Sequence, residues 1–133
     1  MTEFVRELVR RRAGERCEYC RIPQHAIPDV RLHVEHVVAA QHGGTDDPEN
    51  LALACDRCNR HKGTNLTAID PLTKTIVRVF DPRRQHWLEH FGQTNYEIVG
   101  LTETGRATVR LLNMNASARV QLRVALRLDL TVE

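Results

Sequence analysis

The spacing of apolar residues near the N-terminus predicts a helix over residues 2–12. Four apolar residues recur there at helical spacing, with arginines between them: Phe4, Val5, Leu8 and Val9. This is the pattern of an amphipathic helix with one basic face. Gly14 follows, as is common where a helix ends.

A period of two replaces the helical period over residues 30–38, where apolar and polar side chains alternate, and this predicts a strand. Residues 40–50 are dense in turn formers, so we expect an ordered polar loop there. The apolar residues 51–55 predict a short second strand. Residues 59–65 are polar and include Gly63, which predicts a brief helix closed by a glycine cap.

The second half of the chain mixes both periods. It predicts a strand over residues 73–80, a short helix that begins at Pro82, a strand over residues 95–101 and a helix opened by Thr102. From residue 120 to 130 the apolar residues alternate strictly, as in a strand. The composition there favours a helix, and we predict a helix for this tail.

Nothing in the chain signals a linker, a repeat or a low-complexity tract. With 133 residues, we expect one domain over residues 1–133. Within it we expect a core over residues 15–66 and a C-terminal extension over residues 67–133.

The charge is mildly basic at +2, but seventeen of the nineteen cations are arginines. Arginine's planar fork binds phosphate oxygens in pairs, so this bias fits a polyanionic partner. A GC-rich genome would produce the same bias. The N-terminus has no apolar run typical of a secretory signal, and no window approaches a membrane span. These features favour the cytoplasm, where thiols stay reduced.

Four cysteines form two Cys-x-x-Cys pairs separated by 34 residues, Cys17 with Cys20 and Cys55 with Cys58. Four thiolates match tetrahedral zinc, and a site that uses all four positions leaves none for water. We therefore expect a structural zinc that stabilises the fold. The alternatives are a redox pair or unrelated buried thiols. The segment between the pairs is longer than in an ordinary zinc ribbon.

That segment and the second cysteine pair carry a run, VEHVVAAQHGGTDDPENLALACDRCNRHKG, that resembles the HNH family of nucleases. The family pattern has an acidic residue or His beside a His, then a Gly-Gly loop, Asn-Leu, and Cys-x-x-Cys followed by His or Asn. The resemblance covers about residues 17–63. The stretches FDPRRQHWLEHF and GLTETGRATVRLLNMN are similar to the C-terminal part of a subgroup of small bacterial HNH proteins, which assigns no chemistry.

The resemblance implies an α+β fold, a zinc-stabilised, treble-clef-like ββα-metal domain, and a role for each matching residue. His36 matches the general base, Glu35 the first ligand of a catalytic divalent metal, Asn50 the central Asn and Asn59 the second metal ligand. The chain departs from the family name, because Asn59 stands where His is commoner and Glu35 where Asp or His is commoner. We read these departures as a weaker or different metal preference, not as a loss of activity.

Physical chemistry supports these roles. A neutral imidazole takes a proton from water near neutral pH, as a general base must. One carboxylate and one amide oxygen suit magnesium or manganese, which stabilise charge on the phosphate and the departing 3′ oxygen. Neighbours in a strand face opposite ways, so Glu35 and His36 share a site only where the strand ends or bulges. Asn50 would tie down the loop so that a loop carbonyl orients His36.

Each role has a plainer alternative. His36 can be a structural strand histidine, Glu35 a solvated carboxylate, Asn50 a turn residue and Asn59 a helix cap. Whether His33, His42 or His61 joins the site stays open. The candidate phosphate contacts around the second cysteine pair are Arg57, Arg60, His61 and Lys62, with Arg10, Arg11 and Arg12 as a second set. A solvated charged face is the alternative for any of them.

The sequence therefore predicts a metal-dependent endonuclease that acts on DNA, or alternatively RNA, and leaves 5′-phosphate and 3′-hydroxyl ends. The main rival is a non-catalytic zinc module that binds nucleic acid, and a third possibility is a structural zinc domain. No membrane partner is expected. Cleavage specificity, nicking against double-strand cutting and oligomeric state stay open.

Overall fold

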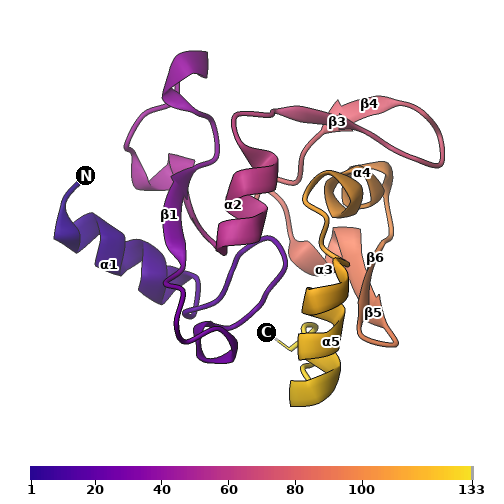
Figure 1. The fold of residues 1–133 in the computed structure, drawn as a ribbon. Helices are drawn as coiled ribbons and strands as arrows, with labels where there is room; N and C mark the ends of the chain where they lie inside the picture. The colour runs from indigo at the N-terminus through magenta and orange to yellow at the C-terminus, as the bar shows by residue number, and fades with distance from the viewer. Residues whose placement is uncertain (133) are drawn as a thin grey trace.

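The computed structural model describes residues 1–132 of the chain, which form five α-helices and three antiparallel strand pairs (Figure 1). The helices are α1 (Glu3–Arg12), α2 (Asp56–Lys62), α3 (Trp87–His90), α4 (Glu103–Leu111) and α5 (Ser117–Leu126). The strands are β1 (His33–His36) with β2 (Leu51–Ala54), β3 (Thr67–Ile69) with β4 (Ile76–Arg78), and β5 (Phe91–Thr94) with β6 (Glu97–Gly100). The predicted α+β class is confirmed.

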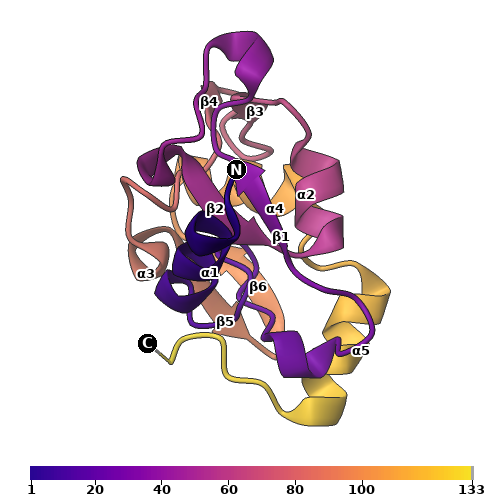
Figure 2. The same ribbon diagram turned by 90° about the vertical axis from the view of Figure 1, so that its left-hand side faces the viewer.

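The β1–β2 hairpin lies between α1 and α2, one helix on each side of it (Figures 1 and 2). Because helices cover both of its faces, β2 is buried at all four positions. Two arginines of α1 fasten that helix to the hairpin. Arg10 donates to the Leu32 carbonyl at 2.9 Å, and Arg12 donates to the Leu51 carbonyl at 2.7 Å.

An aromatic group joins the C-terminal half to the core. The rings of Phe80 and Phe91 pack edge to face with centroids 5.1 Å apart, and Trp87 packs against Phe91 at 5.0 Å. The Trp87 indole donates a 2.7 Å hydrogen bond to the carbonyl of Tyr19, inside the first cysteine pair. This hydrogen bond links the C-terminal half of the chain to the segment that contains the first cysteine pair.

The tail returns to the cysteine-rich region after α5. Arg21 donates to the Leu130 carbonyl at 3.0 Å, and Arg16 donates to the Val132 carbonyl at 2.7 Å. Leu130 is buried and shares one hydrophobic cluster with Val9, Leu53 and other core residues. Apolar burial of this kind is the main favourable term in folding.

Several boundaries differ from those predicted. The first strand is shorter than residues 30–38, and the helix predicted to begin at Pro82 begins at Trp87. The strands β3 and β5 were not predicted, because neither stretch alternates cleanly. The helix opened by Thr102 is confirmed as α4, and the helical tail is confirmed as α5 as far as Leu126, while residues 127–130 lie outside the helix. The division at residue 66 stays a prediction. None of the helices in residues 1–132 combines the length and hydropathy of a membrane span.

Candidate functional site

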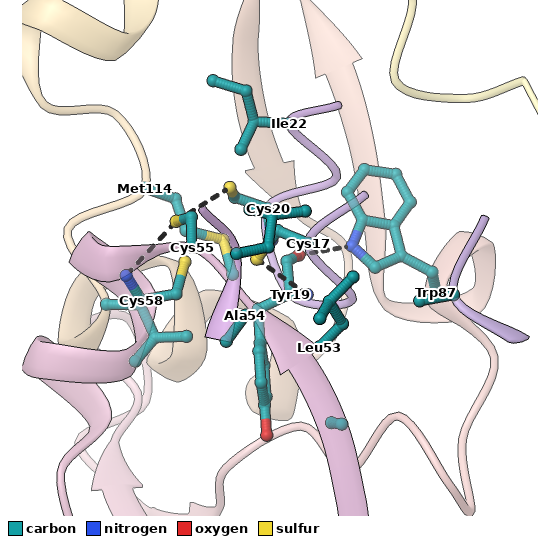
Figure 3. Close-up of a cluster of buried hydrophobic side chains, with 14 of the residues drawn as sticks. Cys17, Tyr19, Cys20, Ile22, Leu53, Ala54, Cys55, Cys58, Trp87 and Met114 are labelled. Atoms are coloured by element: carbon teal, nitrogen blue, oxygen red, sulfur yellow. Dashed lines mark hydrogen bonds between the residues drawn. The ribbon is translucent and has the colours of Figure 1, made fainter. Parts of the chain in front are cut away.

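The four cysteines converge, as the sequence predicts. Their sulfurs all lie within 4.8 Å of one another, and Cys20 Sγ is 3.7 Å from Cys55 Sγ (Figure 3). Zinc with tetrahedral bonds of about 2.3 Å places its sulfurs about 3.8 Å apart, so this spacing fits the ion. In each pair the first sulfur accepts backbone N–H bonds at 3.4 Å: Cys17 from Tyr19 and Cys20, and Cys55 from Cys58. The donor set is that of a closed structural zinc site.

Burial and contact with one another shift the pKa values of the cysteine thiols. Burial raises the pKa of Cys17, while hydrogen bonds from the other three thiols lower the pKa of Cys55. Zinc binds thiolate, so the cluster must release protons when the ion binds.

Arginines from α5 and α2 surround this cysteine cluster. Arg119 and Arg57 line a small pocket with Cys20 and Cys55, and Arg119 also pairs with Asp56 at 3.2 Å. Burial opposes the charge of Arg119, but the nearby Cys55 and Cys20 sulfurs outweigh it and raise its pKa. Arg123, one turn further along α5, is 1% exposed and donates to the Met114 carbonyl at 2.6 Å. The helix α5 therefore presents positive charge to the cluster.

Glu35 is buried on the side of β1 that faces α2. One carboxylate oxygen accepts a 2.5 Å hydrogen bond from the Tyr19 hydroxyl, and the other lies 3.4 Å from Lys62 Nζ. In Figure 3 the Tyr19 hydroxyl points away from the sulfurs. Burial raises the pKa of Glu35 even though Lys62 and Tyr19 stabilise its charge. The alternative of a solvated strand carboxylate is therefore wrong.

Lys62 is buried, whereas a residue that contacts phosphate must be exposed. Its side chain is 3% exposed, and besides Glu35 its ammonium donates to the carbonyls of His36 at 3.3 Å and Val37 at 2.9 Å. A buried ammonium with these partners is a structural tie between α2 and the end of β1. The sequence prediction of Lys62 as a phosphate contact is therefore corrected.

His36 ends β1 and is one third exposed. Its ring nitrogen Nε2 lies 2.7 Å from Asp46 Oδ1, in the loop that follows. The side chains of Glu35 and His36 have different partners, as neighbours in a strand must. The predicted orientation of His36 by a loop carbonyl is not what the structure shows, since a carboxylate contacts the ring.

Asn50 ties the loop down as predicted. Its Oδ1 accepts from the Val38 amide at 2.9 Å, and its Nδ2 donates to the carbonyls of Val38 at 2.9 Å and Thr45 at 2.8 Å. Gly44 packs so closely that a Cβ there would lie 1.7 Å from the Val38 carbonyl oxygen. Gly43 has a φ of +89°, a conformation that favours glycine. Gly43 therefore allows the backbone conformation of the loop, and Gly44 allows the loop to pack closely against the Val38 carbonyl.

Asn59 lies in the middle of α2, half-buried, while the N-cap of that helix is Cys55. Within residues 1–132 its side-chain amide makes no hydrogen bond to the protein. The helix-cap alternative for Asn59 is therefore wrong. An amide without a protein partner is free to bind another group.

The other candidates differ in access. Arg60, His33 and His42 are exposed and His61 is half-buried, so these four can reach a ligand. Arg57 is half-buried, lines the pocket beside the cysteine cluster, and its Nε has no partner within residues 1–132. Arg10 is buried against the Leu32 carbonyl. The prediction of Arg10 as a phosphate contact is corrected on this ground, and that of Arg57 stays a prediction. Arg11 and Arg12 are exposed.

Sequence reasoning missed two residues that contact the candidate site, Tyr19 and Asp46. Tyr19 lies inside the first cysteine pair, and its hydroxyl reaches Glu35 across 16 positions of sequence. Asp46 belongs to the polar loop, where it looks like an ordinary turn former. An ionisable residue in the loop after the proposed base was the one available signal.

A family model described as HNH endonuclease matches residues 17–65 of the chain. No curated protein and no solved structure matches it. The matched segment contains the four cysteines together with Glu35, His36, Asn50 and Asn59, and its family points to a nuclease-type function with metal binding. The similarity of this chain to the HNH endonuclease family therefore lies in residues 17–65.

Proposed function

We propose that this protein is a metal-dependent endonuclease that hydrolyses phosphodiester bonds in DNA. One observation carries the proposal: within the HNH segment, a partly exposed imidazole, His36, stands at the end of β1 beside a loop that Asn50 holds in place. A module that only binds nucleic acid has no need of an oriented imidazole.

His36 would act as the general base. Its neutral ring takes a proton from a water molecule, whose oxygen then attacks phosphorus. The bond to the 3′ oxygen breaks, so the products carry 5′-phosphate and 3′-hydroxyl ends. The locked loop keeps the ring in place, and a fixed geometry lowers the entropic cost of the reaction.

Glu35 and Asn59 would hold one magnesium or manganese ion. Both offer oxygen, which these hard cations prefer. The amide of Asn59 has no protein partner within residues 1–132. Both oxygens of Glu35 already have partners, the Tyr19 hydroxyl at 2.5 Å and Lys62 Nζ at 3.4 Å, so a bound ion would replace the longer contact with Lys62. Lys62 is also anchored by the carbonyls of His36 and Val37, so the carboxylate is not its sole support. When bound, such an ion stabilises negative charge on the phosphate and the leaving oxygen.

Arg60 and His61 on α2 would contact phosphates next to the cleaved bond. Arg60 is exposed and His61 is half-buried. Such contacts position the nucleic acid without reading its sequence, and they weaken as salt increases.

The test is a nicking assay on supercoiled plasmid with added magnesium or manganese, compared with protein dialysed free of both ions. We expect metal-dependent nicking that His36→Ala lowers about 100- to 10,000-fold. His25→Ala is the matched control, because His25 is also exposed but lies in a separate short turn, Gln24–Ala26. Zinc content and melting curves establish that each variant is folded.

Undiminished nicking by His36→Ala would reject His36 as the base. Binding of DNA without cleavage under either metal would favour the non-catalytic zinc module. A parallel assay with RNA, in which only RNA is cut, would change the substrate class.

A further inference from the structure

We propose that Asp46 positions His36 for catalysis by holding the proton of the ring on Nε2, an inference that rests on the endonuclease function proposed above. Asp46 touches neither the metal donors nor the attacking water in this scheme. It acts through His36 alone, so it is a positioning residue.

The contact between the two side chains sets the tautomer of the ring. Asp46 Oδ1 lies 2.7 Å from His36 Nε2. An ionised carboxylate accepts hydrogen bonds and cannot donate them, so Nε2 must carry the proton. The hydrogen bond with His36 lowers the pKa of Asp46, which keeps the carboxylate ionised. The other nitrogen, Nδ1, is then left with a free lone pair that can accept a proton from water.

The backbone around Asp46 is fixed even though its side chain is exposed. Asn50 binds the carbonyl of Thr45, the residue before Asp46, at 2.8 Å. The Asp47 amide after it donates to the Thr45 hydroxyl at 3.3 Å. Asn50 also pairs with Val38, which follows the end of β1. Hydrogen bonds through Asn50 therefore fix Thr45, the residue before Asp46, relative to the segment that follows β1.

Among residues 1–132, Asp46 is the carboxylate that contacts His36. The neighbouring Glu35 points into the interior, toward Tyr19 and Lys62. The two carboxylates near the proposed base thus have different roles in this proposal: Glu35 would bind the metal, and Asp46 would position His36. Glu35 lies on the α2 side of the strand, and Asp46 lies on the loop side.

The step balances with Asp46 unchanged. A proton leaves the attacking water and binds Nδ1, while the water oxygen forms its bond to phosphorus. The bond from phosphorus to the 3′ oxygen breaks, and that oxygen takes a proton from solvent. The Nε2 proton stays in place, and the imidazolium charge is stabilised by the Asp46 carboxylate through a charge-assisted hydrogen bond.

The kinetic test compares Asp46→Ala, Asp46→Asn and Asp47→Ala in the nicking assay. We expect Asp46→Ala to lower kcat about 10- to 100-fold with little change in KM, as when an orienting partner of a catalytic histidine is lost. Asp46→Asn keeps an acceptor oxygen without the charge and should fall in between. Asp47→Ala is the matched control: Asp47 accepts from the Glu49 amide in the same loop, and within residues 1–132 its carboxylate makes no hydrogen bond to His36.

A second measurement reads the ring directly. Nitrogen chemical shifts of the neutral His36 ring should show the Nε2–H tautomer in the unmodified protein and a mixture of tautomers in Asp46→Ala. In a His36→Ala background, adding Asp46→Ala should lower the rate no further, because the two residues act as one unit.

The outcomes separate this inference from the proposed function. Three outcomes would overturn the role of Asp46 and leave the endonuclease function standing. The first is an active wild type with an equally active Asp46→Ala, and the second is an equal loss of activity in Asp47→Ala. The third is an Nδ1–H tautomer of His36 in the unmodified protein. A wild-type protein that nicks no plasmid would overturn the endonuclease function and the role of Asp46 with it.

Discussion

Lys62 on α2 places its ammonium 3.4 Å from the carboxylate of Glu35 on β1, and both side chains are buried. The same ammonium binds the carbonyls of His36 and Val37. One cation therefore holds the helix that carries Asn59 against the strand end that carries the proposed base. The contact thus links the two elements that carry the candidate site.

Replacing Lys62 by Met should destabilise the fold by about 3–5 kcal/mol, because the change removes the one cation that pairs with the buried carboxylate of Glu35 within residues 1–132. Chemical denaturation measures the loss. Lys74→Met is the matched control, since Lys74 is the one other lysine of the chain and is exposed; there we expect a change below about 0.5 kcal/mol. Equal stability of the two variants would contradict the structural role. A Glu35→Leu, Lys62→Met double variant should recover part of the loss.

Cys55→Ser should prevent the fold from forming, because the four sulfurs form one closed site and zinc binding supplies folding free energy. We expect less than one zinc per chain and no cooperative melting transition, measured by metal analysis and circular dichroism. A variant without zinc that melts like the wild type would show that the cysteines do not stabilise the fold through a metal.

Gly44→Ala should displace the loop and lower nicking while zinc content stays unchanged. An added Cβ would lie 1.7 Å from the Val38 carbonyl oxygen, so the backbone must shift. Gly43→Ala is the comparison: φ there is +89°, but nothing lies within 4 Å of the added atom. That change should cost about 1 kcal/mol through strain alone. If the two variants nick plasmid at the same rate, the close approach at Gly44 is unimportant.

The HNH segment was the most predictable part of the molecule because its signals are local. The spacing within each cysteine pair, the Gly-Gly loop and the alternation of residues up to His36 are short sequence patterns. Each one predicts the structure of the few residues that form it. The partners of Glu35 and His36 were not predictable, because they depend on how the strand, the loop and α2 meet in space. Lys62 shows the difference: an ordinary surface lysine by sequence, it is buried by the packing of α2 on β1.

The pairing of Asp70 with Arg106 should make stability depend on pH in acid. Arg106 donates to the Asp70 carboxylate from Nε at 3.0 Å and from Nη2 at 2.7 Å, and this holds the pKa of Asp70 well below its ordinary value of 3.8. A lowered pKa in the folded state means that the ionised form stabilises the fold. The contribution is complete above the ordinary pKa and is lost as the pH falls below it.

Melting temperatures of the wild type and Asp70→Asn, from neutral pH down to about pH 3, measure this contribution. We expect the wild type to be the more stable at neutral pH and the difference to shrink below about pH 4. Loss of zinc in acid affects both proteins alike and cancels in the comparison. A difference that stays constant across this range would show that the ion pair contributes nothing to the pH dependence.

The arginines of α5 have a consequence for how this fold retains its metal. Four thiolates around one zinc ion leave an excess of negative charge, and Arg119 and Arg123 supply positive charge from a helix that contributes no ligand and lies beyond the HNH segment. Coulombic attraction of this kind is strong where water is scarce. The zinc affinity of the cysteine cluster thus depends in part on the C-terminal region of the chain. A fragment cut after residue 65 would therefore release its ion more readily than the whole chain.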